Sequence, residues 1–193
     1  MKRNIYISYI DSESMNYKTK IMDKFKGRKY KYSDESYSLS ETKFEENSDE
    51  LTKLAKNVSR ADVTVVLISR SILDSSWIPL EVGYSLEVVS DSKAQPKPKG
   101  VIGVVIPDKG NDYSYIMKKG MKGRWKADTN KLPVIISSNI LNEKEVQNKN
   151  NIHYDSFISI YRWEDFIGAF ETCINSAYDK ANNYFDDYNV NQL

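Results

Sequence analysis

The sequence predicts an α/β fold with a mostly parallel sheet and helices on both faces, and three observations lead to this prediction. Two apolar runs, Val63–Ile68 and Val101–Ile106, are uninterrupted, as is typical of strands buried on both faces. A β-branched and aromatic segment, Asn4–Ile10, precedes them and is interpreted as the first strand. Helical or polar segments separate these strands, and such alternation favours parallel crossover units.

Helices are predicted between these strands from capping signals and apolar spacing. One is predicted from Asp11 to about Phe25, and another over about 76–89. Between them, residues 47–50 resemble a capping box, and apolar side chains then recur at helical spacing: Leu51, Leu54, Ala55 and Val58. A short strand is expected at 29–32, followed by a polar loop.

The C-terminal third contains weaker signals. Residues 132–137 are interpreted as a strand, which Pro133 places at a sheet edge or a strand start. Residues 157–161 are expected to form a last short strand, and a C-terminal helix is predicted over about 163–184. The polar tail beyond this helix is expected to fray.

Length and composition limit the classes of protein. The 193 residues fit a single domain, 1–193, with a loop insertion at about 109–131 and a polar loop at about 142–151. The net charge of +1 creates no overall field for nucleic acid or membrane, so neither is expected as a partner. No signal peptide and no apolar run long enough to cross a bilayer is found, which predicts a cytoplasmic protein.

The common catalytic and cofactor motifs are missing. The sequence contains neither a P-loop nor a G-x-G-x-x-G motif. His153 is the only histidine and has no cysteine nearby, so we expect neither a metal site nor a Ser-His-Asp triad. Cys173 lies on the apolar face of the last predicted helix and is interpreted as a core residue. We therefore expect no metal and no bound cofactor.

The segment Asp74–Leu86 carries the strongest functional candidate. It opens a helix directly after a buried strand, where polar strand ends typically line the ligand crevice of a parallel sheet. A helical wheel places Glu81 at the boundary of the apolar stripe, with Trp77 one turn earlier. Pro79 places Glu81 near the helix start, where the helix dipole favours an ionised carboxylate. Periodicity alone leaves two interpretations open, a structural glutamate and a catalytic one.

Three segments together resemble the TIR-like family, most closely the bacterial TIR-like proteins of the Thoeris antiphage system. They are the first strand Asn4–Tyr9, the strand Val63–Ser69 and the S-x-W-x-x-x-E-like segment Ser76–Glu81; Gly100–Asp108 is also similar. Asn4 departs from the pattern, since an Asp is common there. The resemblance implies a flavodoxin-like, three-layer fold, and it implies that Glu81 is catalytic and that Ser8, Tyr9, Asp11, Trp77 and Tyr84 contact substrate.

The resemblance also implies an activity. It predicts a hydrolase of the NAD glycohydrolase or ADP-ribosyl cyclase type, with NAD as substrate. The product would be a cyclic ADP-ribose isomer or an ADP-ribose conjugate that activates a partner effector in antiviral defence. A phage component as trigger and a homo-oligomer are further expectations. Two alternatives stay open at this point: a TIR-like scaffold without catalysis, and a hydrolase of another nucleotide.

Overall fold

A computed structural model gives the fold. It describes residues 3–25, 30–32, 48–87, 97–120, 123, 125–142, 144 and 156–192, with the backbone alone for Asp11, Tyr32 and Ser48. Several segments interpreted above lie outside the described residues, namely the polar loop after residue 32, most of 142–151, and His153.

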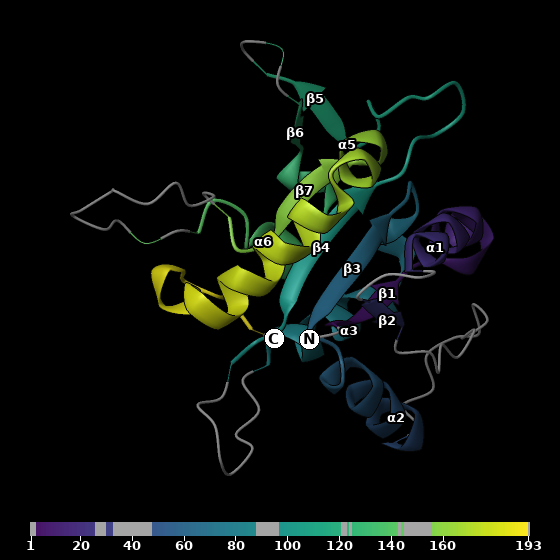
Figure 1. The fold of residues 1–193 in the computed structure, drawn as a ribbon. Coiled ribbons are helices and arrows are strands. Elements are labelled where there is room, and N and C mark those ends of the chain that lie inside the picture. Colours follow the sequence, from purple (N-terminus) through teal and green to yellow (C-terminus); the bar gives the residue numbers. More distant parts are fainter. Residues whose placement is uncertain are drawn as a thin grey trace.

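The centre of the molecule is a five-stranded parallel sheet (Figure 1). Its order is β2-β1-β3-β4-β7, and the strands are β1 (Arg3–Ser8), β2 (Tyr30–Tyr32), β3 (Val63–Ile68), β4 (Gly100–Val105) and β7 (Ser159–Arg162). Every residue of β3 and β4 is buried, as their uninterrupted apolar runs predict. The predicted α/β, flavodoxin-like fold is therefore confirmed.

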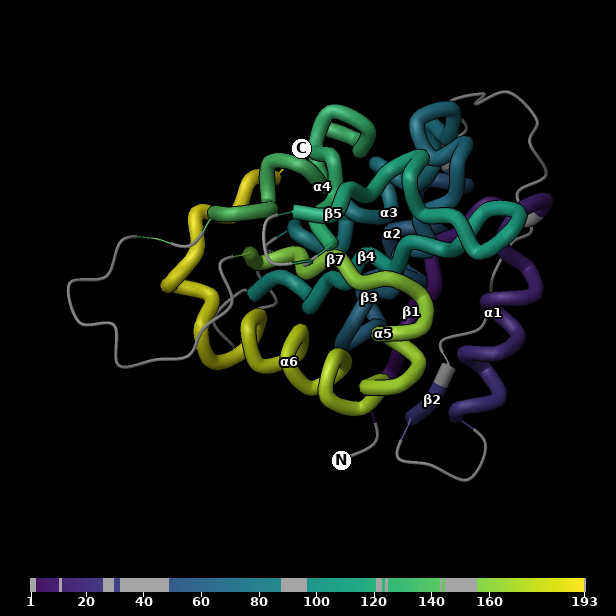
Figure 2. Tube along the Cα trace, turned by 90° about the horizontal axis from the view of Figure 1, so that it is seen from above, coloured from purple at the N-terminus to yellow at the C-terminus, as the bar shows by residue number. Residues whose placement is uncertain are grey.

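Helices cover both faces of this sheet. One face carries α1 (Asp11–Phe25), α5 (Trp163–Gly168) and α6 (Phe170–Asn183), and the rings of Phe25 and Phe170 lie 5.8 Å apart there. The other face carries α2 (Ser48–Ser59), α3 (Trp77–Leu86) and the short α4 (Val134–Ser137), since α3 contacts both α2 and α4. Figure 2 shows α3 and α4 on one side of the strands and α5 and α6 on the other.

The predicted loop insertion contains a small hairpin. Strands β5 (Met117–Lys119) and β6 (Trp125–Ala127) pair antiparallel, apart from the main sheet. Short 3-10 turns complete the described elements: η1 (Ile72–Asp74), η3 (Thr129–Lys131) and η4 (Phe185–Asp187).

Alternation along β1 divides its side chains between the two helical layers. Ile5 and Ile7 belong to the main core, together with Ile21 and Phe25 of α1. Tyr6 belongs to a separate cluster on the α2 and α3 side. Successive strand residues point to opposite faces, so Ser8 lies on the same face as Tyr6. This face is the one on which α3 packs.

Two predictions for the C-terminal third are wrong in part. Residues 132–137 form no strand, because the amides of Ile136 and Ser137 donate to the carbonyl of Pro133 and close a helical turn, α4. The predicted helix at about 163–184 is split at Ala169, whose backbone leaves the helical region (φ −116°, ψ 30°).

The polar tail is packed rather than frayed. Tyr188 is only 2% exposed, and the tail hydrogen-bonds with two buried asparagines, Asn139 and Asn142. The side chain of Gln192 donates to the carbonyl of Leu86 at 3.0 Å and so caps the last turn of α3. Asparagine side chains can replace backbone partners, which polar composition alone does not reveal.

Leu141 occupies a strained position, which leads to a stability prediction. Its φ is +55°, a left-handed conformation that costs a branched residue about 1–2 kcal/mol, and its side chain is 71% exposed. We expect Leu141→Gly to raise the free energy of unfolding by about 0.5–1 kcal/mol in urea denaturation, because relief of strain outweighs the added chain entropy. Leu73→Gly is the control, since Leu73 is also exposed (57%) and has no positive φ. Equal destabilisation of both variants would contradict the interpretation that the backbone at Leu141 is strained.

Candidate functional site

Glu81 lies in the middle of α3, the helix that follows β3. This helix begins at Trp77, and the hydroxyl of Ser75 accepts a hydrogen bond from the amide of Ile78 in its first turn (3.2 Å). Pro79 is tolerated there because the first turn needs no donor at its position. The strand order reverses between β1 and β3, so β1 and the β3–α3 connection border the switch point of the sheet.

Two hydroxyls of β1 hold the carboxylate of Glu81. The phenol of Tyr6 donates to Oε1 at 2.6 Å, and the hydroxyl of Ser8 donates to Oε2. Each carboxylate oxygen therefore has its own donor from the same face of one strand. This arrangement fixes the orientation of the carboxyl group, since both its rotation and its position are constrained.

Glu81 is buried, which corrects the expectation of an ionised boundary residue. Its exposed fraction is 8%, and burial raises its pKa to about 7, although the hydrogen bonds from Ser8 and Tyr6 oppose this rise. A helical wheel considers only the contact with the sheet. Here α2 packs along α3 as well. The side chains of α3 next to its apolar stripe, Glu81 among them, are therefore enclosed by α2 together with the sheet. A carboxyl group with a pKa near 7 changes charge at physiological pH.

A second pair of hydroxyls supports the same helix. Thr64 of β3 and Ser85 of α3 lie 2.8 Å apart, both completely buried, and Ser85 also donates to the backbone carbonyl of Glu81 at 2.8 Å. Thr64 pairs with Tyr6 across the sheet, so these hydroxyls continue the polar row beneath α3. The row fixes the turn of α3 that carries Glu81.

Tyr9 and Asp11 lie near Glu81 in sequence but have other surroundings. The ammonium of Lys18, on α1, donates to the Tyr9 hydroxyl at 2.7 Å and lies 4.6 Å from the ring centroid. Tyr9 thus contacts the α1 side of the sheet, opposite to the face that holds Glu81. Asp11 is the first residue of α1, and its side chain is outside the description. The structure therefore brings Ser8 to Glu81 and does not bring Tyr9.

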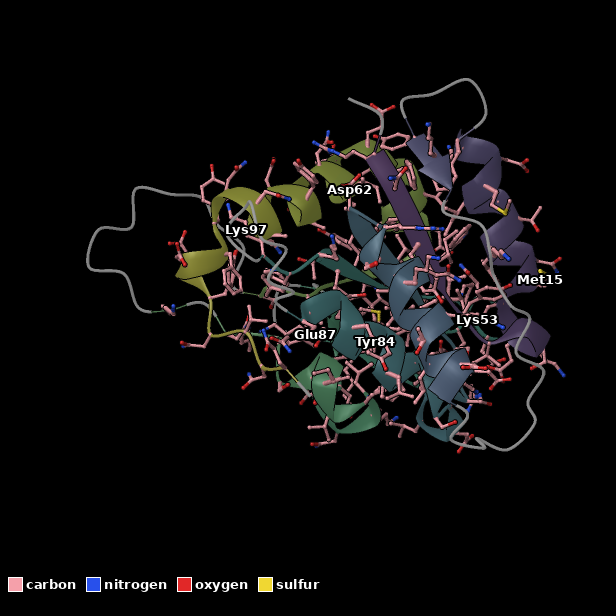
Figure 3. All side chains as sticks on the ribbon, turned by 90° about the horizontal axis from the view of Figure 1, so that it is seen from below. Met15, Lys53, Asp62, Tyr84, Glu87 and Lys97 are labelled. Carbon is pink, nitrogen blue, oxygen red and sulfur yellow. The ribbon has the colours of Figure 1, made fainter. Side chains whose placement is uncertain are left out.

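Trp77 and Tyr84 flank Glu81 on α3 and face α2. Both are half-buried and pack against the cluster of Tyr6, Leu54, Val58 and Ala61. Figure 3 shows Tyr84 where α3 runs beside α2, and Glu87 at the end of the same helix. Trp77 and Tyr84 therefore help to enclose the carboxylate. Their contact with substrate stays a prediction.

Tyr6 is the residue that the sequence interpretation missed. It precedes Ser8 by two positions, and this period alone puts both on one face of a strand. A tyrosine in a buried strand is most often interpreted as a core residue, and its ring does pack in a core cluster. The alternation with Ser8 was the available signal.

The described residues contain neither a cluster suited to a metal ion nor a helix suited to a membrane. Within the described ranges, no group of three or more His, Cys, Asp and Glu side chains could hold a metal ion. Among the described helices, none is both long and apolar enough to cross a bilayer.

The fold and site define an α/β protein of the flavodoxin-like class, with a buried carboxylate beside its switch point. Residues 6–111, more than half of the chain, match the family model of the Thoeris protein ThsB, TIR-like domain. The chain belongs to this family, as the resemblance of its strand and helix segments predicted, and is a TIR-type defence protein. The match spans Tyr6, Ser8 and Glu81.

Proposed function

We propose that this protein cleaves the bond between nicotinamide and ribose in NAD, with Glu81 as the catalytic carboxylate. The ADP-ribosyl group then forms a cyclic ADP-ribose isomer or a conjugate, which acts in the cytoplasm as a signal to a partner effector during phage infection. The observation that supports this proposal most directly is the buried, doubly hydrogen-bonded Glu81 in a chain of the TIR-like family.

The chemistry suits an oriented carboxylate. As the bond from ribose C1′ to the pyridinium nitrogen breaks, the electron pair leaves with neutral nicotinamide and positive charge develops on the ribosyl ring. A carboxylate held nearby stabilises that charge and accepts hydrogen bonds from the ribose hydroxyls. Water, or another nucleophile, then bonds to C1′ and releases its proton. Exclusion of water from the site would favour cyclisation or conjugation over hydrolysis.

Glu81→Gln tests the proposal. The variant keeps the size of the side chain but removes the negative charge, and it replaces one of the two acceptor oxygens with an NH2 group that donates to a hydroxyl oxygen instead. Nicotinamide release from NAD is measured with purified protein and with lysate of phage-infected cells, because activity can depend on a trigger. Glu87→Gln is the matched control, since Glu87 caps the same helix and is exposed. Equal nicotinamide release by wild type and Glu81→Gln would refute the assignment.

The pH dependence provides a second test. Because burial raises the pKa of Glu81 to about 7, the ionised form that the reaction needs is lost as the pH falls through 7. We therefore expect kcat/KM for NAD to fall about tenfold per pH unit below pH 7. A glutamate with an ordinary pKa would stay active to about pH 4.5. A profile that is flat from pH 8 to pH 5 would contradict a catalytic Glu81.

The scaffold alternative makes a different prediction in cells. A non-catalytic TIR-like module would protect cells equally well with glutamate or glutamine at position 81. Phage protection by Glu81→Gln, measured beside Glu87→Gln, therefore separates signalling by a product from signalling by contact.

A further inference from the structure

The two donors to Glu81 occupy different depths along β1. Ser8 is the last residue of the strand, whereas Tyr6 lies two residues deeper on the same face. Ligands of doubly wound sheets bind beyond the carboxyl ends of the strands. The hydroxyl of Ser8 is therefore the donor on the side from which a ligand arrives.

The two donors also differ in how firmly they are held. The ring of Tyr6 packs in a buried cluster with Leu54 and Val58 of α2, and Trp77 packs against this cluster. The position of its hydroxyl is fixed by the ring. The hydroxyl of Ser8 leaves the carboxylate by rotation about a single side-chain bond. Exchange of a partner is therefore easier at Oε2 than at Oε1.

We infer that Tyr6 is a positioning residue that keeps its hydrogen bond to Oε1 throughout the reaction, whereas a ribose hydroxyl of the substrate replaces the Ser8 hydroxyl on Oε2. This inference rests on the proposed function, because it specifies how Glu81 meets a ribose. A carboxylate accepts a hydrogen bond from a ribose hydroxyl as it does from a serine hydroxyl. Substrate binding then restores the contact that Ser8 gives up, and no covalent bond changes in the exchange.

The surroundings of Glu81 make the exchange measurable. Burial raises the pKa of Glu81, and the hydrogen bonds from Ser8 and Tyr6 lower it. No charged side chain among the described residues shifts this pKa. The α2 residues in the neighbouring cluster, Leu54 and Val58, are apolar, and the hydroxyls of Thr64 on β3 and Ser85 on α3 do not titrate in this range. Loss of either donor therefore shifts ionisation to higher pH, with no neighbouring charge to compensate.

Tyr6→Phe and Ser8→Ala in the full chain separate the two roles. The profile of kcat/KM reports the free enzyme, and that of kcat reports the substrate complex. Tyr6→Phe is expected to shift the acidic limb of both profiles to higher pH by roughly one unit, since a hydrogen bond to a charged group has about that effect on a pKa. Activity at pH 7 falls about fivefold, because the ionised fraction drops from about a half to about a tenth, and it recovers near pH 9. Ser8→Ala is expected to shift the acidic limb of the kcat/KM profile alone to higher pH. In the substrate complex, the ribose hydroxyl has already replaced the Ser8 hydroxyl on Oε2.

Two results would overturn the inference. An equal shift of the kcat limb in both variants would show that Ser8 stays on the carboxylate in the complex. A loss of activity in Tyr6→Phe that no pH restores would show a merely structural role. The carboxyl carbon of Glu81, titrated by ¹³C NMR with and without ADP-ribose, gives the same comparison without turnover. Tyr6→Phe must raise the pKa in both samples and Ser8→Ala only without ADP-ribose, even if the wild type cleaves no NAD.

Discussion

Glu81→Gln is expected to stabilise the protein at pH 8 by up to about 3 kcal/mol while it lowers NAD cleavage by on the order of 10²–10³-fold or more. The stability effect follows from the pKa of about 7 in the fold, compared with 4.5 for a free glutamate. Below pH 4.5 the carboxyl group is protonated in both the folded and unfolded states, so the substitution has little effect. Above pH 7 the fold must bury a charge that the unfolded chain leaves in water, and glutamine removes this cost.

The measurement is thermal unfolding of both proteins between pH 4.5 and pH 8.5. For a chain of this size the expected gain at pH 8 corresponds to a rise in Tm of roughly 5–10 °C. The rise should shrink towards zero at the acidic end. Glu87→Gln should leave Tm nearly unchanged, as is usual for an exposed position. A gain that does not depend on pH would mean that Glu81 ionises like a free glutamate in the fold.

Opposite effects of one substitution on stability and activity would be informative beyond this residue. A variant that loses activity because it misfolds also loses stability, so a more stable inactive protein excludes that explanation. The buried charge is then a cost that the fold bears for its chemistry. Tyr6 and Ser8 reduce this cost without removing it, which keeps the pKa within the physiological range.

Sequence patterns predicted the fold correctly where the pattern of a segment is compatible with only one structural environment. The runs that form β3 and β4 are buried on both faces, and such runs have few alternatives. The segment that forms α4 is also apolar and β-branched, but it is too short for its periodicity to distinguish a strand from a helical turn. Backbone bonds to the carbonyl of Pro133 decide between them, and these depend on tertiary packing against α3.

The candidate site was predictable to a similar extent. The position of Glu81 on a helix after a buried strand followed from spacing and resemblance. Its burial did not, because that depends on α2, which a helical wheel of α3 cannot include. The orientation of Tyr9 towards α1 has a related cause, since neighbouring residues at a strand end point to opposite faces of the sheet, and its contact with substrate stays a prediction. Contacts between elements, rather than patterns within them, determine which neighbours a side chain has.

Gly100→Ala is expected to destabilise the protein by about 3 kcal/mol, the second large effect. A Cβ at this position would lie 2.5 Å from the carbonyl oxygen of Ala177 and 2.6 Å from its carbonyl carbon. These are backbone atoms of α6, so no side-chain rotation relieves the clash, and the helix must move away from β4. Urea denaturation measures the loss. Gly168→Ala is the control, because an added Cβ there meets nothing within 4 Å, and we expect it to be neutral or stabilising by up to about 1 kcal/mol.

Gly103 shows why the identity of the clashing atoms matters for this prediction. A Cβ there would meet the terminal Cδ1 carbons of Ile160 and Ile68, at 2.4 and 2.8 Å. Ile160→Val removes the nearer of these atoms, so Gly103→Ala should cost less in that background than in the wild type. No side-chain substitution offers the same relief to Gly100→Ala, because its clash is with the backbone. If Gly100→Ala proved as mild as Gly168→Ala, the close contact between β4 and α6 would be wrong.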